Sequence, residues 1–218
     1  MRNITIKKVE TKRELDDFIQ FPNKLYANCP YYVPDLDMDI RNMFNPTKNA
    51  GLEFSDIQAF IAINDQGKLM GRIVGIINHH ANKTWKTQNV RFGYFDFVDD
   101  IKISEALLNA VAQWGKERGM ENIQGPMGIT DFDKEGMLLE DFDRMGSINT
   151  IYNYAYYPKH MEALGYKKEV DWVQIHIDIP PETPKKYARI ARFVKEKTDN
   201  DNNIAGLLME LNTLPDTI

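Results

Sequence analysis

The sequence predicts an α/β chain, of the α+β type, with a mixed, mostly antiparallel central sheet flanked by helices. Two observations predict this fold class. Residues 57–64 and 69–78 are apolar strands on either side of the turn 65–68, where Gly67 supplies the positive φ of a β-hairpin. Residues 90–124 have the pattern of a strand, an amphipathic helix and a second strand, and such a crossover makes its two strands parallel. A parallel pair beside an antiparallel hairpin gives a mixed sheet.

The N-terminal part predicts a strand, a helix and a long irregular stretch. Residues 4–9 alternate apolar with polar side chains, as a half-buried strand does. Thr11 is a helix-capping residue type, and Phe18 and Ile19 belong to the apolar side of the helix that follows it. Four prolines fall within residues 21–51, so we expect loops and short helical turns there. The aromatic residues that hold this stretch to the domain are Tyr26, Tyr31, Tyr32 and Phe44.

The parallel part of the sheet is built around the helix that follows the strand 90–98. One face of this helix is apolar, and it consists of Ile103, Leu107, Ala110, Val111 and Trp114. Gly119 ends the helix as a left-handed residue. Residues 121–124 must then be a strand that runs parallel to 90–98.

The C-terminal part holds a long connection and two further helices. Residues 125–149 are polar, acidic and too long for an ordinary connection, so they are a candidate lid or substrate loop. A helix with Pro158 in its first turn follows, and then a strand at 172–177. Residues 181–197 predict a basic amphipathic helix. We therefore divide the chain into a domain at 1–180 and a C-terminal basic helix and tail at 181–218.

Composition narrows the function classes. The formal net charge of -5 and the pI near 5.4 repel a polyanion, so no nucleic acid partner is expected. No window approaches the roughly 18 apolar residues of a membrane span, so no membrane partner is expected either. The single cysteine, Cys29, excludes an intramolecular disulfide and indicates a reducing compartment. A cytoplasmic protein is the expectation.

Three short patterns carry a family resemblance. They are the hairpin sequence 67–71, the helix from Ala106 to Gly119 and the helix ending 162–166. Together with the order of elements, they make residues 3–178 resemble the GNAT superfamily of N-acetyltransferases. Segments 71–82 and 152–158 resemble a divergent GNAT-like group. The resemblance implies an acyltransferase domain at 1–180, acetyl-CoA as co-substrate and an amine of a small molecule or peptide as acceptor. It leaves a homodimer open.

The cofactor loop departs from the superfamily pattern. There the third strand leads into a Q/R-x-x-G-x-G/A loop, whose backbone amides bind the pyrophosphate of acetyl-CoA. Asp99, Lys102 and Ser104 occupy the corresponding positions here. Asp99 and Asp100 fit helix caps better, because a capping carboxylate accepts those amide protons and repels phosphate. Lys102 and Ser104 remain the candidate phosphate contacts, and we expect any CoA binding to be weak.

The resemblance also assigns the reacting groups. Met161 stands where the superfamily often has the tyrosine that protonates the thiolate, so Tyr156 and Tyr157 are the candidate acids. Asp96, in an aromatic strand, is the candidate base, because a poorly solvated carboxylate takes up a proton more readily. A bulge in this strand would free a backbone N–H for the thioester oxygen. The candidate cofactor-binding residues are Phe95, Phe97, Val98, Lys102 and Ser104.

Structural interpretations of the same residues stay open. Asp96 is explained more simply as a strand carboxylate that caps a neighbouring amide. The aromatic segment either lines an acceptor pocket or packs in the core, and it consists of Tyr152, Asn153, Tyr154, Tyr156 and Tyr157. A catalytically silent GNAT-like ligand-binding or regulatory module is therefore the alternative function.

The spacing of the candidate ligands argues against a metal site. Residues 131–136 begin like a calcium loop, but Phe142 stands where a bidentate glutamate is needed. His79 and His80 are adjacent, so on a strand they point to opposite faces and share no metal. We expect no metal site.

Overall fold

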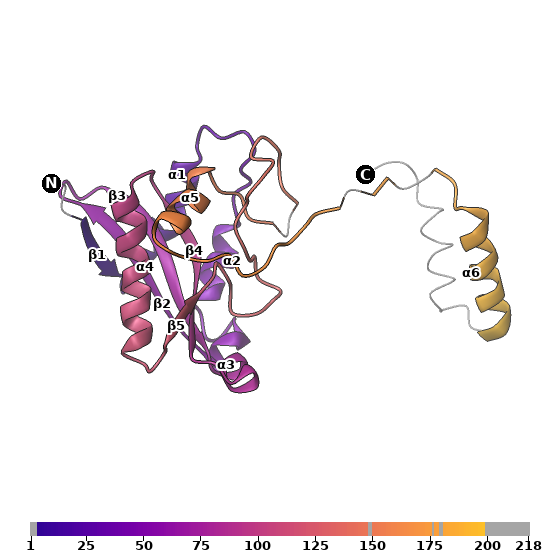
Figure 1. Cartoon of the computed structure of the whole chain (residues 1–218), viewed down its shortest axis with the longest axis horizontal. Helices are drawn as coiled ribbons and strands as arrows, with labels where there is room; N and C mark the ends of the chain where they lie inside the picture. Colours follow the sequence, from indigo (N-terminus) through magenta and orange to yellow (C-terminus); the bar gives the residue numbers. More distant parts are fainter. Residues whose placement is uncertain (1–3, 148–149, 176, 179–180, 199–218) are drawn as a thin grey trace. The chain divides into compact units, whose positions relative to one another are not determined.

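The computed structural model describes residues 4–147, 150–175, 177–178 and 181–198 (Figure 1). The chain divides into two compact units, Met1–Val170 and Asp171–Ile218. The sequence predicts the boundary at residue 180. The predicted tail, 199–218, lies outside the described residues. No helix in the described part is long and apolar enough to cross a bilayer.

The first unit contains a five-stranded sheet in the order β1-β2-β3-β4-β5. The strands are β1 (Ile4–Lys8), β2 (Ser55–Asn64), β3 (Leu69–Asn78), β4 (Asn89–Phe97) and β5 (Asn122–Gln124). The first four pair antiparallel, and β5 pairs parallel to β4 after the crossover helix α4 (Ile101–Lys116). This arrangement confirms the predicted mixed, mostly antiparallel sheet flanked by helices.

Helices cover both faces of the sheet. On one face α4 lies along the strands (Figure 1), and it packs so closely that a Cβ on Gly75 would lie 3.0 Å from the Trp114 ring. On the other face, residues of α1 (Lys12–Leu25) and α2 (Asp37–Met43) pack against Ile61, Val74 and Ile76. Both helices precede β2, and α5 (Tyr156–Ala163) packs with the α4 side through Tyr157.

The stretch 21–51 contains more helix than its prolines predict. α1 continues to Leu25 with Pro22 inside it, so the prediction that the loop begins at residue 21 was wrong. The helix survives because Tyr26 N–H still bonds to Pro22 O at 2.8 Å, beyond the proline. The short helical turns are confirmed as α2 and the 3₁₀ turn η1 (Ala50–Glu53).

Two further predictions were wrong. His79 and His80 begin a helix, α3 (His79–Trp85), because Asn78 caps it by accepting a hydrogen bond from Ala81 N–H at 2.8 Å. Residues 172–175 and 177 form no strand, and their side chains are exposed. An alternating pattern becomes a strand only beside a partner strand, and these residues have none within the described part of the chain. The second unit's described helix is α6 (Lys185–Thr198).

Candidate functional site

β4 is irregular in its middle. Its register against β3 shifts between Arg72 and Val74, and Tyr94 has a left-handed φ of 48°. The predicted bulge in this strand is therefore present. β4 pairs with β5 only over residues 89–91, followed by a hydrogen bond of 2.7 Å from Met127 N–H to Phe92 O. In the described part of the chain, the pairing of β4 with β5 does not extend beyond this bond. The backbone groups of residues 93–97 on that edge of β4 can therefore contact other parts of the protein or a ligand.

Gly93 of β4 lies close to the backbone of Met127. A Cβ at this position would lie 2.4 Å from Met127 O, so any other residue would push β4 and residue 127 apart. The β-bulge at Tyr94 is the next residue, so the close contact with Met127 and the bulge are adjacent in β4. At this edge of the sheet the backbone groups of β4 are accessible to a substrate.

A cavity of about 860 Å³ lies against this bulge. Its wall includes Gly93, Tyr94, Phe95 and Asp96 of β4, and Arg72 of β3. Further walls come from residues within 31–49 and 126–137, from residues 146–147 and 150–153, and from α5. The predicted substrate loop therefore lines the cavity. Its aromatic lining consists of Tyr31, Tyr32, Tyr94, Phe95, Phe132, Tyr152 and Tyr157.

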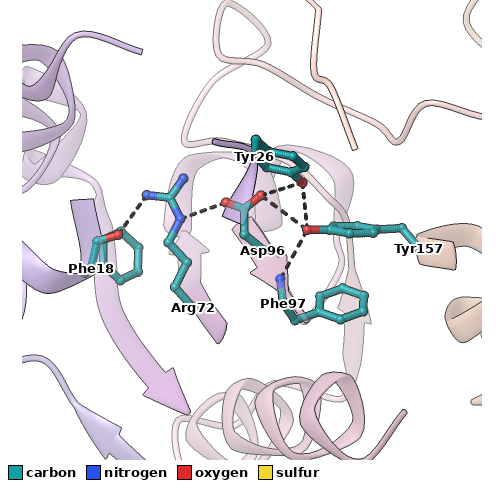
Figure 2. Close-up of polar contacts among 6 residues, drawn as sticks. All are labelled: Phe18, Tyr26, Arg72, Asp96, Phe97 and Tyr157. Carbon is teal, nitrogen blue, oxygen red and sulfur yellow. Dashed lines mark hydrogen bonds and ion pairs between the residues drawn. The ribbon is translucent and has the colours of Figure 1, made fainter. Parts of the chain in front are cut away.

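A buried ion pair lies at one wall of the cavity. Arg72 Nε donates to Asp96 Oδ2 at 2.7 Å, and the two side chains are 4% and 13% exposed (Figure 2). The guanidinium lies over the Phe18 ring at 4.9 Å and the Tyr94 ring at 5.7 Å. Arg72 Nη1 also donates to Phe18 O at 3.1 Å. This carbonyl is available because Pro22, four residues later in α1, has no N–H to donate.

Two tyrosine hydroxyls face the other oxygen of Asp96. Tyr26 donates to Asp96 Oδ1 at 3.2 Å, and the hydroxyls of Tyr26 and Tyr157 are 2.8 Å apart. Tyr157 lies 3.4 Å from the same oxygen and accepts a hydrogen bond of 3.1 Å from Phe97 N–H (Figure 2). Burial, followed by the charge of Asp96, raises the pKa of both phenols well above 10. Both are therefore neutral proton donors near pH 7.

The structure thus brings Asp96 and Tyr157 together, as the site prediction requires, and adds Arg72 and Tyr26. From the sequence, Tyr26 was expected only to pack the stretch 21–51 against the rest of the domain. No local pattern identifies it, because it comes from the end of α1 and meets Asp96 across 70 positions of sequence.

The main-chain groups of Phe97 and Val98, two of the predicted cofactor contacts, are hydrogen-bonded within the protein. Phe97 O accepts a hydrogen bond from the Tyr156 hydroxyl, and Val98 N–H donates to Met70 O at 3.0 Å. The Phe95 and Phe97 rings are buried in the core. In this structure α5 therefore satisfies both main-chain groups of Phe97, including the N–H that was a candidate donor to the thioester oxygen.

The N-terminus of α4 is capped, and the capping residue is Asp100. Its carboxylate accepts from Lys102 N–H at 3.0 Å. Asp99 instead contacts His160 Nε2 at 3.0 Å, and His160 Nδ1 lies 3.0 Å from Ser104 Oγ. Ser104 is fully buried and donates to the backbone at Ile101 O, so this Asp-His-Ser arrangement offers no accessible nucleophile. Only Lys102 of the predicted phosphate contacts is exposed.

Asn153 is another residue whose role depends on tertiary contacts. Its Oδ1 accepts from Leu138 N–H at 2.7 Å, and its Nδ2 donates to Leu138 O at 3.2 Å. It therefore ties the 125–149 passage to the start of α5. In the part of the chain that the structure describes, no three His, Cys, Asp or Glu side chains are grouped as metal ligands.

The buried tyrosines predict an alkaline loss of stability. Burial raises the pKa of Tyr94 to about 12, so between pH 10 and 12 this phenol is ionised only in the unfolded chain. Its contribution to stability is complete below pH 10 and is lost as the pH rises to 12. We expect Tyr94→Phe to reduce the slope of unfolding free energy against pH by about 1.4 kcal/mol per unit in this range, measured by urea unfolding. Tyr187→Phe, at a residue 60% exposed, is the control; an equal change in both variants would contradict this assignment.

Comparisons with known proteins give two curated relatives. Protein YghO of Escherichia coli strain K12 is 32% identical over 167 residues, which are 75% of this chain and 42% of that protein. A bacterial ceramide synthase of Caulobacter vibrioides is 24% identical over 184 residues, 84% of this chain and 48% of that protein. The chain therefore spans less than half the length of each relative. No protein-family model matches it.

A solved structure similar to this chain is a predicted acetyltransferase with acetyl-CoA from Clostridium acetobutylicum. The identity is 11%, the TM-score is 0.47, and the match covers 80% of this chain and 96% of that one.

Proposed function

We propose that the first unit is an acyltransferase that moves an acyl group from an acyl-CoA to the amine of a small molecule. The observation that carries this proposal is the cavity at the β4 bulge, where Asp96 and Tyr157 line one wall within hydrogen-bonding distance of each other. The GNAT-like fold and the name of the ceramide synthase relative support it, since a ceramide is by definition a fatty amide.

The reaction needs a base, a donor to the thioester oxygen and an acid. The amine attacks the thioester carbon, the C–S bond breaks, and the products are an amide and a thiol. In our assignment Asp96 takes the proton of the amine, and Tyr157 gives its own proton to the thiolate. Because Tyr157 lies 3.4 Å from Asp96 Oδ1, the proton on Asp96 then returns to Tyr157. The proton balance closes within the pair.

The direct test is an activity assay with a panel of amines and several acyl-CoAs, in which release of the CoA thiol measures turnover. Thermal shifts with acetyl-CoA, CoA and longer acyl-CoAs are recorded in parallel. Amide formation supports the proposal. Ligand-dependent shifts without any amide formation would instead support the silent binding module. The observation that favours this alternative is that Tyr156 and Tyr157 already bond the carbonyl and the N–H of Phe97.

CoA binding itself is expected to be weak and salt-sensitive. Asp99 and Asp100 place negative charge at the N-terminus of α4, where Lys102 is the nearest cation in the sequence. Asp99→Asn removes one charge and keeps an oxygen for His160, so calorimetry should show tighter CoA binding. Asp65→Asn in the β2–β3 turn changes net charge equally and serves as the control. Tight wild-type binding that is unaffected by salt would place the phosphates elsewhere.

A further inference from the structure

Three oxygen atoms meet beside the cavity, and they are not equally spaced. The hydroxyls of Tyr26 and Tyr157 are 2.8 Å apart, and the Tyr26 hydroxyl lies 3.2 Å from Asp96 Oδ1. The direct contact between the Tyr157 hydroxyl and the same carboxylate oxygen is longer, at 3.4 Å. Figure 2 shows the triangle that the three groups form. Tyr26 is therefore closer to each of the other two groups than they are to each other.

These distances decide which route a proton takes between Asp96 and Tyr157. Proton transfer between two heavy atoms needs a hydrogen bond of about 2.6–3.2 Å. Both contacts of the Tyr26 hydroxyl fall within this range, whereas the direct contact of Tyr157 with Asp96 exceeds it. A hydroxyl both accepts and donates a hydrogen bond, so Tyr26 can take a proton on one side and give one on the other.

Tyr26 itself is held away from the substrate. It is 2% exposed, and it does not belong to the described cavity wall, which includes Asp96 and Tyr157. Its ring stacks on Tyr32 at 4.4 Å, and its N–H is bonded to Pro22 O at 2.8 Å. Among the described residues, the hydrogen bonds of its hydroxyl go to Asp96 and Tyr157. Any effect of this hydroxyl on the reaction therefore passes through those two residues.

We propose that Tyr26 is the relay through which Asp96 returns the proton of the amine to Tyr157. This inference rests on the proposed function. When the C–S bond has broken, Asp96 carries the amine proton and Tyr157 is a phenolate. Asp96 then gives its proton to the Tyr26 oxygen while the proton of Tyr26 moves to Tyr157. Asp96 is again an anion, both tyrosines are again neutral, and no net proton enters or leaves the protein.

The surroundings of the three oxygens suit this cycle. The phenolate of Tyr157 faces two donors, Phe97 N–H at 3.1 Å and the Tyr26 hydroxyl at 2.8 Å. Arg72 Nε donates to Asp96 Oδ2 at 2.7 Å, so Oδ1 is the oxygen that takes up the amine proton and faces Tyr26. Tyr26 is thus a positioning residue that also carries the proton, and its loss should slow the return step most.

The test measures release of the CoA thiol by Tyr26→Phe in the pre-steady state, with the amine and acyl-CoA that give the fastest turnover in the panel. The variant keeps the ring and loses the hydroxyl. Its first turnover uses the proton already on Tyr157, whereas every later turnover needs that proton to be replaced. The ratio of the first-turnover rate to the steady-state rate should therefore rise by about tenfold or more over the wild type. The steady-state phase should also be slower in D₂O than in H₂O.

Tyr166→Phe is the matched control, because it removes the hydroxyl of a partly buried tyrosine that packs on Phe92. It should keep the wild-type ratio of the two rates. In Tyr26→Phe, an equal decrease of both rates would make Tyr26 purely structural, and unchanged rates would remove it from the cycle. Either result overturns the relay and leaves the proposed function standing. If the wild type acylates no amine with any acyl-CoA, the proposed function fails and the relay is overturned with it.

Discussion

Asp96→Asn should lower turnover by about 10²–10⁴-fold and the free energy of unfolding by about 3–5 kcal/mol. The catalytic loss follows from removal of the proposed base. The loss of stability has a separate origin, because Arg72 then keeps a buried positive charge without its counter-ion, and the hydroxyls of Tyr26 and Tyr157 lose an anionic acceptor. Urea unfolding measures the stability, and turnover is expressed per folded molecule.

Asp16→Asn is the matched control. Asp16 pairs with Arg41, but these side chains are 44% and 38% exposed, so the change should be below about 1 kcal/mol. Similar losses of unfolding free energy in both variants would show that the buried Arg72–Asp96 pair stabilises the fold no more than an exposed pair does. If the wild type shows no turnover while Asp96→Asn still lowers the melting temperature, the carboxylate is structural and the binding module is the function to keep.

Tyr157→Phe is expected to lower turnover by about 10²-fold or more, because it removes the proposed acid. It also leaves Phe97 N–H without the oxygen that accepts its hydrogen bond, so stability should fall by about 1–3 kcal/mol. A rapid-quench or steady-state assay with saturating acyl donor measures the first effect. Melting measures the second.

Tyr156→Phe separates acid catalysis from support of the backbone. Both hydroxyls bind the main chain of Phe97, Tyr156 at the carbonyl and Tyr157 at the amide, but only Tyr157 also lies within 3.4 Å of Asp96. We expect Tyr156→Phe to change turnover by less than about tenfold. Equal losses in the two variants would remove Tyr157 from the role of acid and assign both tyrosines to the structure of β4.

Local patterns were sufficient for the sheet and most of its helices. The turn at Gly67 and the apolar flanks predict the hairpin, and the stop at Gly119 with the chirality of crossovers predicts the parallel strand β5. Capping chemistry placed the start of α1 at Thr11, where the capping box is present, and the start of α4 at Asp99 or Asp100, of which Asp100 is the cap. These features depend on residues that are close in sequence.

Predictions from local sequence were wrong where a contact with a residue distant in sequence outweighs the local preference of the chain. Pro22 predicts the end of a helix, but α1 continues past it, and the carbonyl of Phe18 is bonded to Arg72 of β3. Ser104 matches a cofactor-loop position by register, but it is buried against His160. Each outcome depends on a partner between 54 and 56 positions away, which no window of sequence contains.

The sequence by itself determined the β2–β3 hairpin and the parallel pair β4–β5, but it also predicted a strand that residues 172–175 and 177 do not form. It identified Asp96, Tyr156 and Tyr157 as the chemical groups of interest. Tertiary structure alone decided what surrounds them. Arg72, Tyr26 and Tyr157 reach Asp96 from β3, α1 and α5, and their hydrogen bonds set which protons and charges are available. The physical reason is that strand pairing follows from periodicity and chain chirality, which are local, whereas the environment of a buried charge is the sum of groups brought together only by folding.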